Sequence, residues 1–388
     1  DMTWTTSNKA LLQRSYGTDE RINDFQFVSE TMASIRSPRW STRMTAGDQG
    51  RSSVDWLPFF HLETDEDGLV VAIGWSGQWA AEIDRPEQKL IRLRAGMEHT
   101  HLRLHPGERI RTPRILLLYR RGDVCHGQNL LRQLILKHHT PYYDGQPLLA
   151  PACHASWGGT PTAQHMDFFR LIAEHDLRYD YYWVDAGWYG MSPEPCPDVF
   201  TGDSWWKDVD DWRVNPYRHP GGLKPISEAA HRAGMKFLLW VEPERARQGT
   251  PVTLEHPEWF FARQSDAARR EGDNLLLNQG HPEALRWVTD LISGLIEENG
   301  IDCYRQDFNM SPLPYWQANE AADRQGMAEI RHIEGLYAFW DTLRARHPHL
   351  MIDNCSSGGR RIDLETISRS IPLWRNDYNC FPAADPEV

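Results

Sequence analysis

Short runs in which apolar and polar residues alternate fill the first part of the chain. In FFHLETDEDGLVVAIGW, residues 59–75, two runs flank the turn residues DEDG, and TPRILLLYRRGD, residues 112–123, is another run that ends near a glycine. A period of two places every second side chain on one face, which is typical of half-buried antiparallel strands. We therefore predict antiparallel strands between about residue 25 and residue 119, forming an N-terminal β-sandwich.

The pattern changes near residue 140. Residues 122–139 have the spacing of a connecting helix, and HHTPYYDGQP, residues 138–147, is rich in turn formers. Beyond this junction, short apolar runs alternate with helical patterns, which indicates βαβ units and a parallel sheet. The sequence thus predicts two domains, residues 1–140 with the connecting helix and residues 141–388.

Six apolar runs in the second domain read as successive strands. They are LLAPACHASW (148–157), YYWVDAGW (181–188), FLLWVEPE (237–244), CYRQDFN (303–309), LMIDNCSSGG (350–359) and IPLWRNDY (371–378). Helices are expected at 166–175, 226–234, 282–300 and 330–347. This α/β order predicts a (β/α)8-type barrel that is incomplete in this chain, because such a barrel has eight strands. We expect the final strands, and any C-terminal domain, to lie beyond residue 388; an open barrel is the alternative.

Each predicted strand passes from apolar residues to a side chain suited to binding or catalysis. These side chains are Trp157, Asp185, Glu242, Asp307, Cys355 and Asp377. In a (β/α)8 barrel, the carboxyl ends of the strands and the loops after them form the active site. The sequence therefore predicts a single site at this end of the barrel.

Charge and composition narrow the classes of partner. The chain has 54 Asp and Glu against 42 Lys and Arg, a formal net charge of −12, which repels nucleic acid and anionic lipid. There is no run of 18 apolar residues and no basic, apolar leader pattern at the start, so we expect no membrane segment. A cytoplasmic location is favoured, and a periplasmic or secreted one remains open if other sequence precedes residue 1.

Metal or disulfide chemistry is not indicated. The six cysteines are scattered without a C-x-x-C pair. His99, His101 and His105 have a spacing compatible with metal ligands, but we expect a solvated strand face there. Asn309 and Asn354 begin N-x-S sequences that read as glycosylation acceptors, although both would lie at the mouth of the predicted site. No cofactor and no metal are therefore expected.

Asp307 and Asp377 are the candidate catalytic pair. Glycoside hydrolysis needs one carboxylate at the anomeric carbon and one acid that protonates the leaving oxygen. Arg305 lies two residues before Asp307, hence on the same strand face, where its charge would keep Asp307 ionised as a nucleophile. Trp374 and Tyr378 flank Asp377 and would raise its pKa, as an acid requires. Taken singly, either aspartate could instead cap a helix or pair with an arginine.

Tryptophan supports the same class of site. The chain has 17 of them, and indole faces stack on sugar rings while their N–H groups reach hydroxyls. Those interleaved with the polar strand ends are predicted to form the walls of a sugar pocket: Trp157, Trp188, Trp212 and Trp240.

Long blocks of the chain resemble the α-galactosidases of glycoside hydrolase family 36. In the second domain they are YYWVDAGWYG, DDWRVNPYRHPGGLKPISEAAHRAGMKFLLWVEPER, CYRQDFN and NCSSGGRRIDLETISRSIPLWRND. In the first, SPRWSTRMTAGDQGRSSVDWLPFFHLETDEDGLVVAIGWSGQW and HPGERIRTPRILLLYRRGD are similar to that family's N-terminal β-sandwich. The resemblance covers nearly the whole chain, in the family's order and spacing.

The resemblance implies a metal-free, retaining exo-glycosidase that acts on oligosaccharides or glycoconjugates with a terminal α-galactose-type sugar. It places the nucleophile at Asp307 and the acid/base at Asp377, with Asp363 as the competing candidate for the latter. The implied substrate-binding positions are Asp185, Trp157, Trp212, Trp240, Arg305, Cys355 and Gly358. Glu242 and Arg245 also match, but they could equally form a structural ion pair beneath the pocket. Members often form dimers or tetramers, which leaves a homo-oligomer open, although the sequence itself does not indicate an oligomeric state.

Two departures from the family pattern bear on the sugar. Family members active on galactose usually have paired aspartates where this chain has Asp185-Ala186, and Lys-Trp-Asp where it has Arg305-Gln306-Asp307. A lost carboxylate removes hydroxyl acceptors, and an arginine replaces a point charge by a planar fork. An α-N-acetylgalactosaminide, an α-galactosaminide or a β-L-arabinopyranoside is therefore an alternative substrate. A catalytically silent galactose-binding protein and a metal-dependent barrel hydrolase are the alternatives from other classes.

Overall fold

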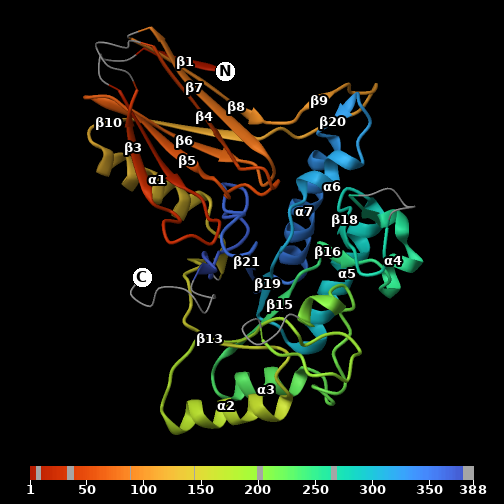
Figure 1. Cartoon of the computed structure of the whole chain (residues 1–388). Coiled ribbons are helices and arrows are strands. Elements are labelled where there is room, and N and C mark those ends of the chain that lie inside the picture. Colours follow the sequence, from red (N-terminus) through yellow and green to blue (C-terminus); the bar gives the residue numbers. More distant parts are fainter. Residues whose placement is uncertain are drawn as a thin grey trace.

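The structure is a computed structural model that describes residues 1–5, 10–32, 39–87, 89–143, 145–198, 204–263 and 269–378. Its N-terminal part is a sandwich of two antiparallel sheets (Figure 1). One sheet has the order β1 (Met2–Thr5), β8 (Leu90–Met97), β7 (Trp79–Glu87), β4 (Trp40–Thr45). The other has the order β10 (Arg114–Arg121), β6 (Asp67–Gly74), β5 (Trp56–Glu63), β2 (Leu11–Tyr16), β3 (Phe27–Thr31). The predicted β-sandwich is confirmed.

The apolar positions of these strands meet between the two sheets. In β7 every second residue is buried, as expected for a strand with one wet face, and Trp79, Ala81 and Ile83 point into the core. β6 is buried on both faces because the helix α1 (Val124–His138) packs against it and against β10. The side chain of Asp123 caps α1 by accepting a hydrogen bond from the His126 amide at 2.8 Å.

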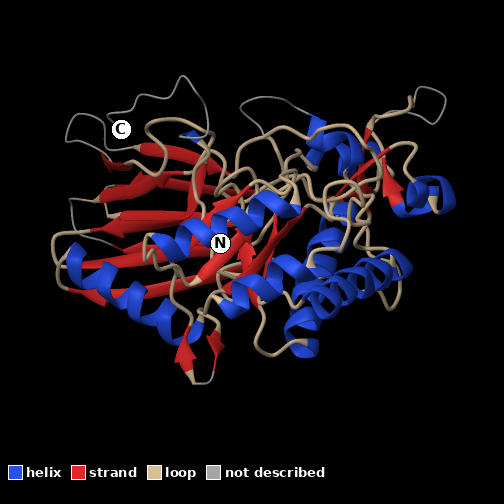
Figure 2. Cartoon of the chain, turned by 90° about the horizontal axis from the view of Figure 1, so that it is seen from below, coloured by secondary structure: helices blue, strands red, loops and turns tan. Residues whose placement is uncertain are grey.

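The second part contains a parallel sheet whose strands follow one another in chain order. They are β13 (Cys153–Ser156), β14 (Tyr181–Val184), β15 (Lys236–Val241), β19 (Cys303–Gln306) and β21 (Met351–Asn354). The helices α2 (Thr162–Glu174), α3 (Lys224–Arg232), α5 (Pro282–Asn299) and α7 (Met327–Arg346) connect them, close to the predicted ranges. Figure 2 shows the layered strands of the sandwich on the left and helices of the second part from the centre to the right.

The predicted sixth strand, residues 371–378, was wrong in extent. Only Ile371 bridges to Asp353 of β21. The next residue is Pro372, which has no N–H to continue a ladder. The amide of Leu373 then donates to the side chain of Asp353 at 2.9 Å instead of to a strand. In the described part of the chain the sheet therefore does not close, which agrees with the predicted incomplete barrel.

The parallel sheet has two different faces. Leu239, Tyr304 and Ile352 point outward to the apolar core under α5 and α7. The inner face carries a smaller apolar cluster that includes Trp183 and Cys303. Toward the carboxyl ends of the strands, the side chains on this face become polar. Helix α5 begins with a proline in its first turn and ends at Gly300, whose φ of 62° allows the left-handed cap.

Shorter elements complete the second part. Between β15 and α5 lie β16 (Arg245–Arg247), α4 (Pro251–Glu255), β17 (Phe260–Phe261) and β18 (Asn274–Leu277), and α6 (Leu313–Ala318) precedes α7. The hairpin of β11 (Tyr142–Tyr143) and β12 (Gln146–Pro147) lies at the predicted domain junction. The strand β9 (His101–Leu102) pairs with β20 (Arg324–Gln325) and ties the sandwich to the second part.

The sandwich core continues into the second part of the molecule. Phe308, Leu313, Trp316 and Tyr337 belong to the same buried cluster as the strands of the sandwich. Because these residues follow β19 or lie on α6 and α7, the sandwich packs directly behind the loop that follows β19. That contact positions the candidate site.

Candidate active site

Three side chains in register line the inner face near the strand ends. Trp240 of β15 pairs with Arg305 of β19, and Arg305 pairs with Asp353 of β21. The Arg305 guanidinium forms a buried ion pair with Asp353 and lies 4.2 Å from the ring centre of Trp183. The partners on both sides fix the guanidinium beneath the site.

Asp307 lies directly after β19, and its carboxylate accepts four hydrogen bonds. The donors to Oδ1 are the amides of Phe308 at 2.7 Å and Ser357 at 3.1 Å, and those to Oδ2 are Nε1 of Trp240 at 3.1 Å and Nδ2 of Asn309 at 2.8 Å. Burial alone would raise the pKa of Asp307, but the Arg305 guanidinium and the hydrogen-bond donors outweigh it. The pKa lies below its usual range, so the group is a carboxylate at neutral pH.

Asp377 has the opposite electrostatic character. Burial, and then the charge of Asp307, raise the pKa of Asp377 to about 7. The predicted direction agrees with this shift. The predicted cause was incomplete, because the flanking Trp374 is 39% exposed and the second contribution is the Asp307 carboxylate.

The turn after β21 brings Asp377 to the site. Gly358 has a φ of 78°, and a Cβ there would lie 3.2 Å from the Asp377 nitrogen, so only glycine fits without strain. Cys355, at the start of this turn, is buried and donates its amide to the Gln306 carbonyl at 2.8 Å. Its thiol also lowers the pKa of Asp307, while burial raises the pKa of the thiol itself far above the usual range.

Asp185 follows β14 on the same side of the sheet. Its Oδ1 accepts a hydrogen bond from the Ala186 amide at 2.7 Å. Burial raises the pKa of Asp185, and Arg305 opposes the shift. Ala186 is itself buried in the apolar core, and its methyl group offers no polar atom to the site.

Glu242 and Arg245 form the buried ion pair that the sequence left open. Nε and Nη2 of Arg245 donate to Oε2 of Glu242 at 3.0 and 2.6 Å. The other oxygen of Glu242 accepts a hydrogen bond from the backbone N–H of Asn309. The side-chain amide of the same asparagine donates to Asp307. Burial raises the pKa of Glu242. The pair holds the loop after Asp307.

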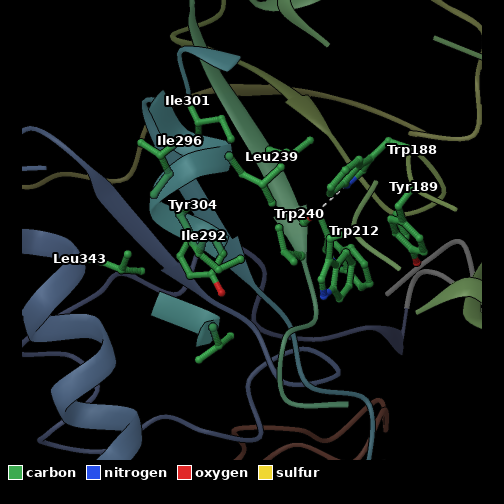
Figure 3. Packing of buried hydrophobic residues seen from close by; sticks show 14 of the residues in the cluster. Trp188, Tyr189, Trp212, Leu239, Trp240, Ile292, Ile296, Ile301, Tyr304 and Leu343 are labelled. Atoms are coloured by element: carbon green, nitrogen blue, oxygen red, sulfur yellow. Dashed lines mark hydrogen bonds between the residues drawn. The ribbon is translucent and has the colours of Figure 1, made fainter. Parts of the chain in front are cut away.

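Three of the four predicted wall tryptophans, Trp188, Trp212 and Trp240, pack close together (Figure 3). Trp157 is half-buried and donates to the Cys196 carbonyl at 2.8 Å, and Trp240 reaches Asp307 directly. Trp188 and Trp212 lie in the apolar core beside Trp240, and Nε1 of Trp188 donates to the Trp240 carbonyl at 2.8 Å. These contacts hold the Trp240 indole in place.

Asp363 is engaged elsewhere. Its carboxylate accepts hydrogen bonds from Ser52 Oγ at 2.8 Å and from the amides of Glu365 at 2.8 Å and Thr366 at 3.2 Å. It caps the following turn and attaches it to the sandwich.

The other polar features of the sequence have plain structural outcomes. In the described ranges, no three His, Cys, Asp or Glu side chains are grouped so that they could hold a metal ion. His101 and His105 are exposed, as expected.

The described ranges contain no helix long and apolar enough to cross a bilayer. The side-chain amides of the two N-x-S sequences are both engaged within the protein: that of Asn309 donates to Asp307, and that of Asn354 donates to the Arg361 carbonyl.

A model of the melibiase family matches residues 111–381. That stretch is more than half of the 388-residue chain and includes both aspartates. The chain belongs to the melibiase family. The resemblance to glycoside hydrolase family 36 is thereby confirmed.

Known melibiase-like proteins match across most of this chain. Alpha-galactosidase Mel36A of Lactobacillus acidophilus is 24% identical over 345 residues, which cover 85% of this chain and 45% of the relative. Alpha-galactosidase C of Emericella nidulans is 25% identical over 350 residues, covering 84% and 44%. The chain thus spans about half the length of the curated relatives it matches.

Solved structures agree on the fold of this melibiase-family chain. A variant of the GH36 α-galactosidase AgaA from Geobacillus stearothermophilus, in complex with stachyose, has a TM-score of 0.81 at 20% identity and covers 97% of this chain and 51% of its own. The galactosidase domain of the α-galactosidase-sucrose kinase AgaSK has a TM-score of 0.77 at 22% identity, covering 97% and 50%.

The sandwich supplies a residue that the sequence did not point to. Nη1 of Arg51 donates to the Phe308 carbonyl at 3.0 Å and to Ser357 Oγ at 3.2 Å. Burial, and then the charge of Arg360, lower the pKa of Arg51 to about 9, a value at which it is still a cation at neutral pH. Arg51 lies in a block that resembled the family, but nothing in its spacing linked it to Asp307.

A buried polar network behind the site was also missed. Glu244 accepts hydrogen bonds from Gln306 Nε2 at 2.7 Å and Arg361 Nη1 at 2.6 Å, and its Oε2 lies 3.0 Å from Nε2 of His332. Burial would raise the pKa of Glu244, but these partners hold it at about 2. The network joins β19 to the turn that contacts Asp377.

Proposed function

We propose that the protein is a retaining exo-glycosidase that hydrolyses terminal α-linked galactose-type residues. The observation that carries the proposal is the opposite perturbation of two neighbouring carboxyl groups, Asp307 below its usual pKa and Asp377 at about 7. Environments that separate two carboxyl pKa values assign one to the nucleophile and the other to the acid. Membership of the melibiase family and relatives named α-galactosidases support the choice of sugar.

In the first step, the Asp307 carboxylate attacks the anomeric carbon. The bond from that carbon to the glycosidic oxygen breaks, and the oxygen takes the proton of Asp377, which leaves a glycosyl ester on Asp307. Trp240, Asn309 and the Ser357 amide hold the attacking carboxylate in one orientation.

In the second step, Asp377 is a base. It removes a proton from water as the water oxygen attacks the anomeric carbon, and the ester bond to Asp307 breaks. The free sugar leaves, Asp307 is again a carboxylate, and Asp377 is again protonated. Two inversions at the same carbon give net retention.

A different sugar with the galactose configuration is the second candidate. The buried Ala186 and the arginine at residue 305, which is paired with Asp353, distinguish this site from the pattern usual for galactose. An N-acetylgalactosaminide, a galactosaminide and a β-L-arabinopyranoside each differ from a galactoside in one ring substituent. Any of them would therefore present a different group to the part of the site that contains Ala186 and Arg305.

The test is a panel of nitrophenyl glycosides of these four sugars, with Asp307→Asn as the control. We expect turnover of at least one of them, loss of turnover by at least about 10³-fold in Asp307→Asn, and an unchanged circular dichroism spectrum. Binding of galactose without turnover of any of the four would support the silent sugar-binding protein instead. Loss of activity on chelation would favour the metal-dependent hydrolase.

A further inference from the structure

Asp353 is a buried carboxyl group near the carboxyl end of β21 to which the proposed reaction gives no role. Its side chain is fully enclosed, and burial raises its pKa, while Arg305 opposes the shift. Both oxygens are engaged: Oδ2 pairs with Nη1 of Arg305, and Oδ1 accepts a hydrogen bond from the backbone N–H of Leu373 at 2.9 Å. Because an ionised group is costly to bury unless it is paired, these contacts stabilise a carboxylate at this place.

The two partners of Asp353 lie on the two segments that carry the catalytic candidates. Arg305 is two residues before Asp307, and the strand register places it directly opposite Asp353. Leu373 is four residues before Asp377, and a bridge two residues earlier joins the same segment to β21. The segment of the nucleophile and the segment of the acid are therefore attached to the same side chain.

The charge of Arg305 is shared between several carboxyl groups. Asp185, Asp307 and Asp353 all act on its guanidinium, and Asp353 has the largest effect of the three. The hydrogen bond to Asp353 and the ring of Trp183, whose centre lies 4.2 Å from the guanidinium carbon, hold the group on the inner face of the sheet. The share of the positive charge that acts on Asp307 thus depends on Asp353.

Three cysteines also act on Asp353, one from each neighbouring segment: Cys153 of β13, Cys303 of β19 and Cys355 after β21. Burial raises the pKa of all three thiols, and that of Cys153 to about 11, so they are neutral at pH 7. Arg305 and Asp307 are then the charged members of this group. A change in the charge of Asp353 therefore acts directly on this pair.

We propose that Asp353 is a positioning residue: it holds the Arg305 guanidinium close to Asp307 and anchors the segment of Asp377 at the same point. The inference rests on the proposed hydrolase function, and it adds a third carboxyl group that acts through its two partners and not on the sugar. One side chain thereby fixes both the charge beside the nucleophile and the backbone that leads to the acid.

Asp353→Asn tests the charge alone. The amide oxygen still accepts the Leu373 N–H, whereas Arg305 loses its counter-charge and acts more strongly on the neighbouring carboxyl groups. Four charged groups act on Asp377: Asp307, Arg305, Glu20 and Arg360. Since a negative charge is removed and Arg305 is no longer neutralised, we expect the pKa of Asp377 to fall from about 7 by at least about half a unit. The descending limb of kcat/KM should move to lower pH by the same amount.

Two further variants separate the charge from the anchor. Asp353→Asn combined with Arg305→Gln removes both charges, so the pKa of Asp377 should return to about 7 or rise above it, because Arg305 lowers it. Asp353→Ala also removes the acceptor for the Leu373 N–H, and its kcat should fall about tenfold further than that of Asp353→Asn. A purely structural role would not reverse the pKa shift in the double variant.

The pKa of Asp377 is measured by NMR on protein with carbon-13 in its aspartate carboxyl groups, and Asp377→Asn assigns the resonance. Asp290→Asn is the matched control, because it breaks an aspartate–arginine pair with Arg346 on the exposed surface of α5 and should change neither the pKa nor kcat. Circular dichroism establishes that each variant is folded. If Asp353→Asn does not fold, asparagine and alanine at residue 353 are compared in the Arg305→Gln background, which leaves no unpaired cation.

The outcomes separate this role from the proposed function. A pKa of Asp377 that stays at about 7 in Asp353→Asn, or stays low in the double variant, would overturn the positioning role. Equal kcat with asparagine and alanine at residue 353 would exclude the anchor at Leu373. If the unmodified protein hydrolyses none of the nitrophenyl glycosides, the hydrolase function fails. The NMR titration needs no substrate, so it still decides whether Asp353 controls the charge of this site.

Discussion

Gly358 packs against Asp377 so closely that a Cβ at residue 358 would lie 3.2 Å from the Asp377 nitrogen. The residue before it, Ser357, donates its amide to Asp307 at 3.1 Å. Two consecutive residues of one turn thus contact both catalytic candidates. The spacing of the two carboxyl groups depends on this turn.

Replacing Gly358 by alanine should therefore damage the site more than the fold. The positive φ costs about 1 kcal/mol for a residue with a Cβ, and the added atom must push the Asp377 backbone away. We expect a small fall in melting temperature and a fall in kcat of at least about tenfold, because small displacements of a catalytic group are costly. Gly222→Ala also has a positive φ but meets no atom within 4 Å, so it controls for strain alone. Equal kcat in the two variants would exclude a spacing role.

The pH profile should reveal Asp377 as the acid. Its pKa is raised to about 7, so the protonated form required in the first step is lost as the pH rises through that value. We expect kcat/KM on an unactivated galactoside to fall about tenfold per pH unit above pH 7. The pKa of Asp307 lies below its ordinary value of 3.8, so the acid limb should appear only below that pH.

Asp377→Asn provides the check on that assignment. The descending limb should disappear, and an activated substrate such as α-galactosyl fluoride should lose less of its first-step rate than raffinose does, since fluoride needs little protonation. A descending limb that persists near pH 7 in this variant would assign the ionisation to another group.

Arg51 should matter for activity although it lies in the sandwich. Arg51→Met leaves the Phe308 carbonyl without its donor and removes a positive charge that favours ionised Asp307. We expect a loss of about 1–3 kcal/mol in unfolding free energy and an upward shift of the acid limb of kcat/KM. Arg51→Lys keeps the charge and should leave the acid limb in place. An equal shift of the acid limb in Arg51→Met and Arg51→Lys would contradict an electrostatic role for Arg51.

Breaking the network around Glu244 should destabilise the protein. Glu244→Gln leaves the buried guanidinium of Arg361 without a counter-charge, which typically costs about 3–5 kcal/mol. Urea unfolding measures the effect, and Glu298→Gln on the exposed surface of α5 is the control. A loss below about 1 kcal/mol would mean that Arg361 finds another partner.

The periodicity of the sequence predicted those elements that local patterns determine. The runs at residues 59–75 and 112–123 fall on the strands β5, β6 and β10, and the apolar runs of β14, β15 and β19 were also placed correctly. Arg305 was expected to keep Asp307 ionised because residues two apart share a strand face, and it lowers the pKa of Asp307 in the structure. The apolar run at Ile371 misled, because Pro372 interrupts the ladder that the other side chains favour.

Contacts between distant segments could not be predicted in this way. Arg51 and Phe308 are 257 residues apart, and no periodicity relates them. The sequence analysis considered Asn309 only as part of an N-x-S sequence. In the structure its side-chain amide donates to Asp307, a contact that the N-x-S sequence does not predict. Trp188 and Trp212 lie in the predicted group of tryptophans, but only the packing reveals that they contact Trp240.

The hydrogen bonds of residues 51–53 limit how the sandwich can be exchanged between proteins of this fold. Arg51 reaches Phe308, Ser52 reaches Asp363, and Ser53 Oγ donates to the Gly359 carbonyl at 2.6 Å. A chimera that exchanges the sandwich for that of a relative would separate these partners unless the donor domain brings an equivalent tripeptide. The sandwich and the second part of the molecule are thus coupled through this short segment and the turn that it supports.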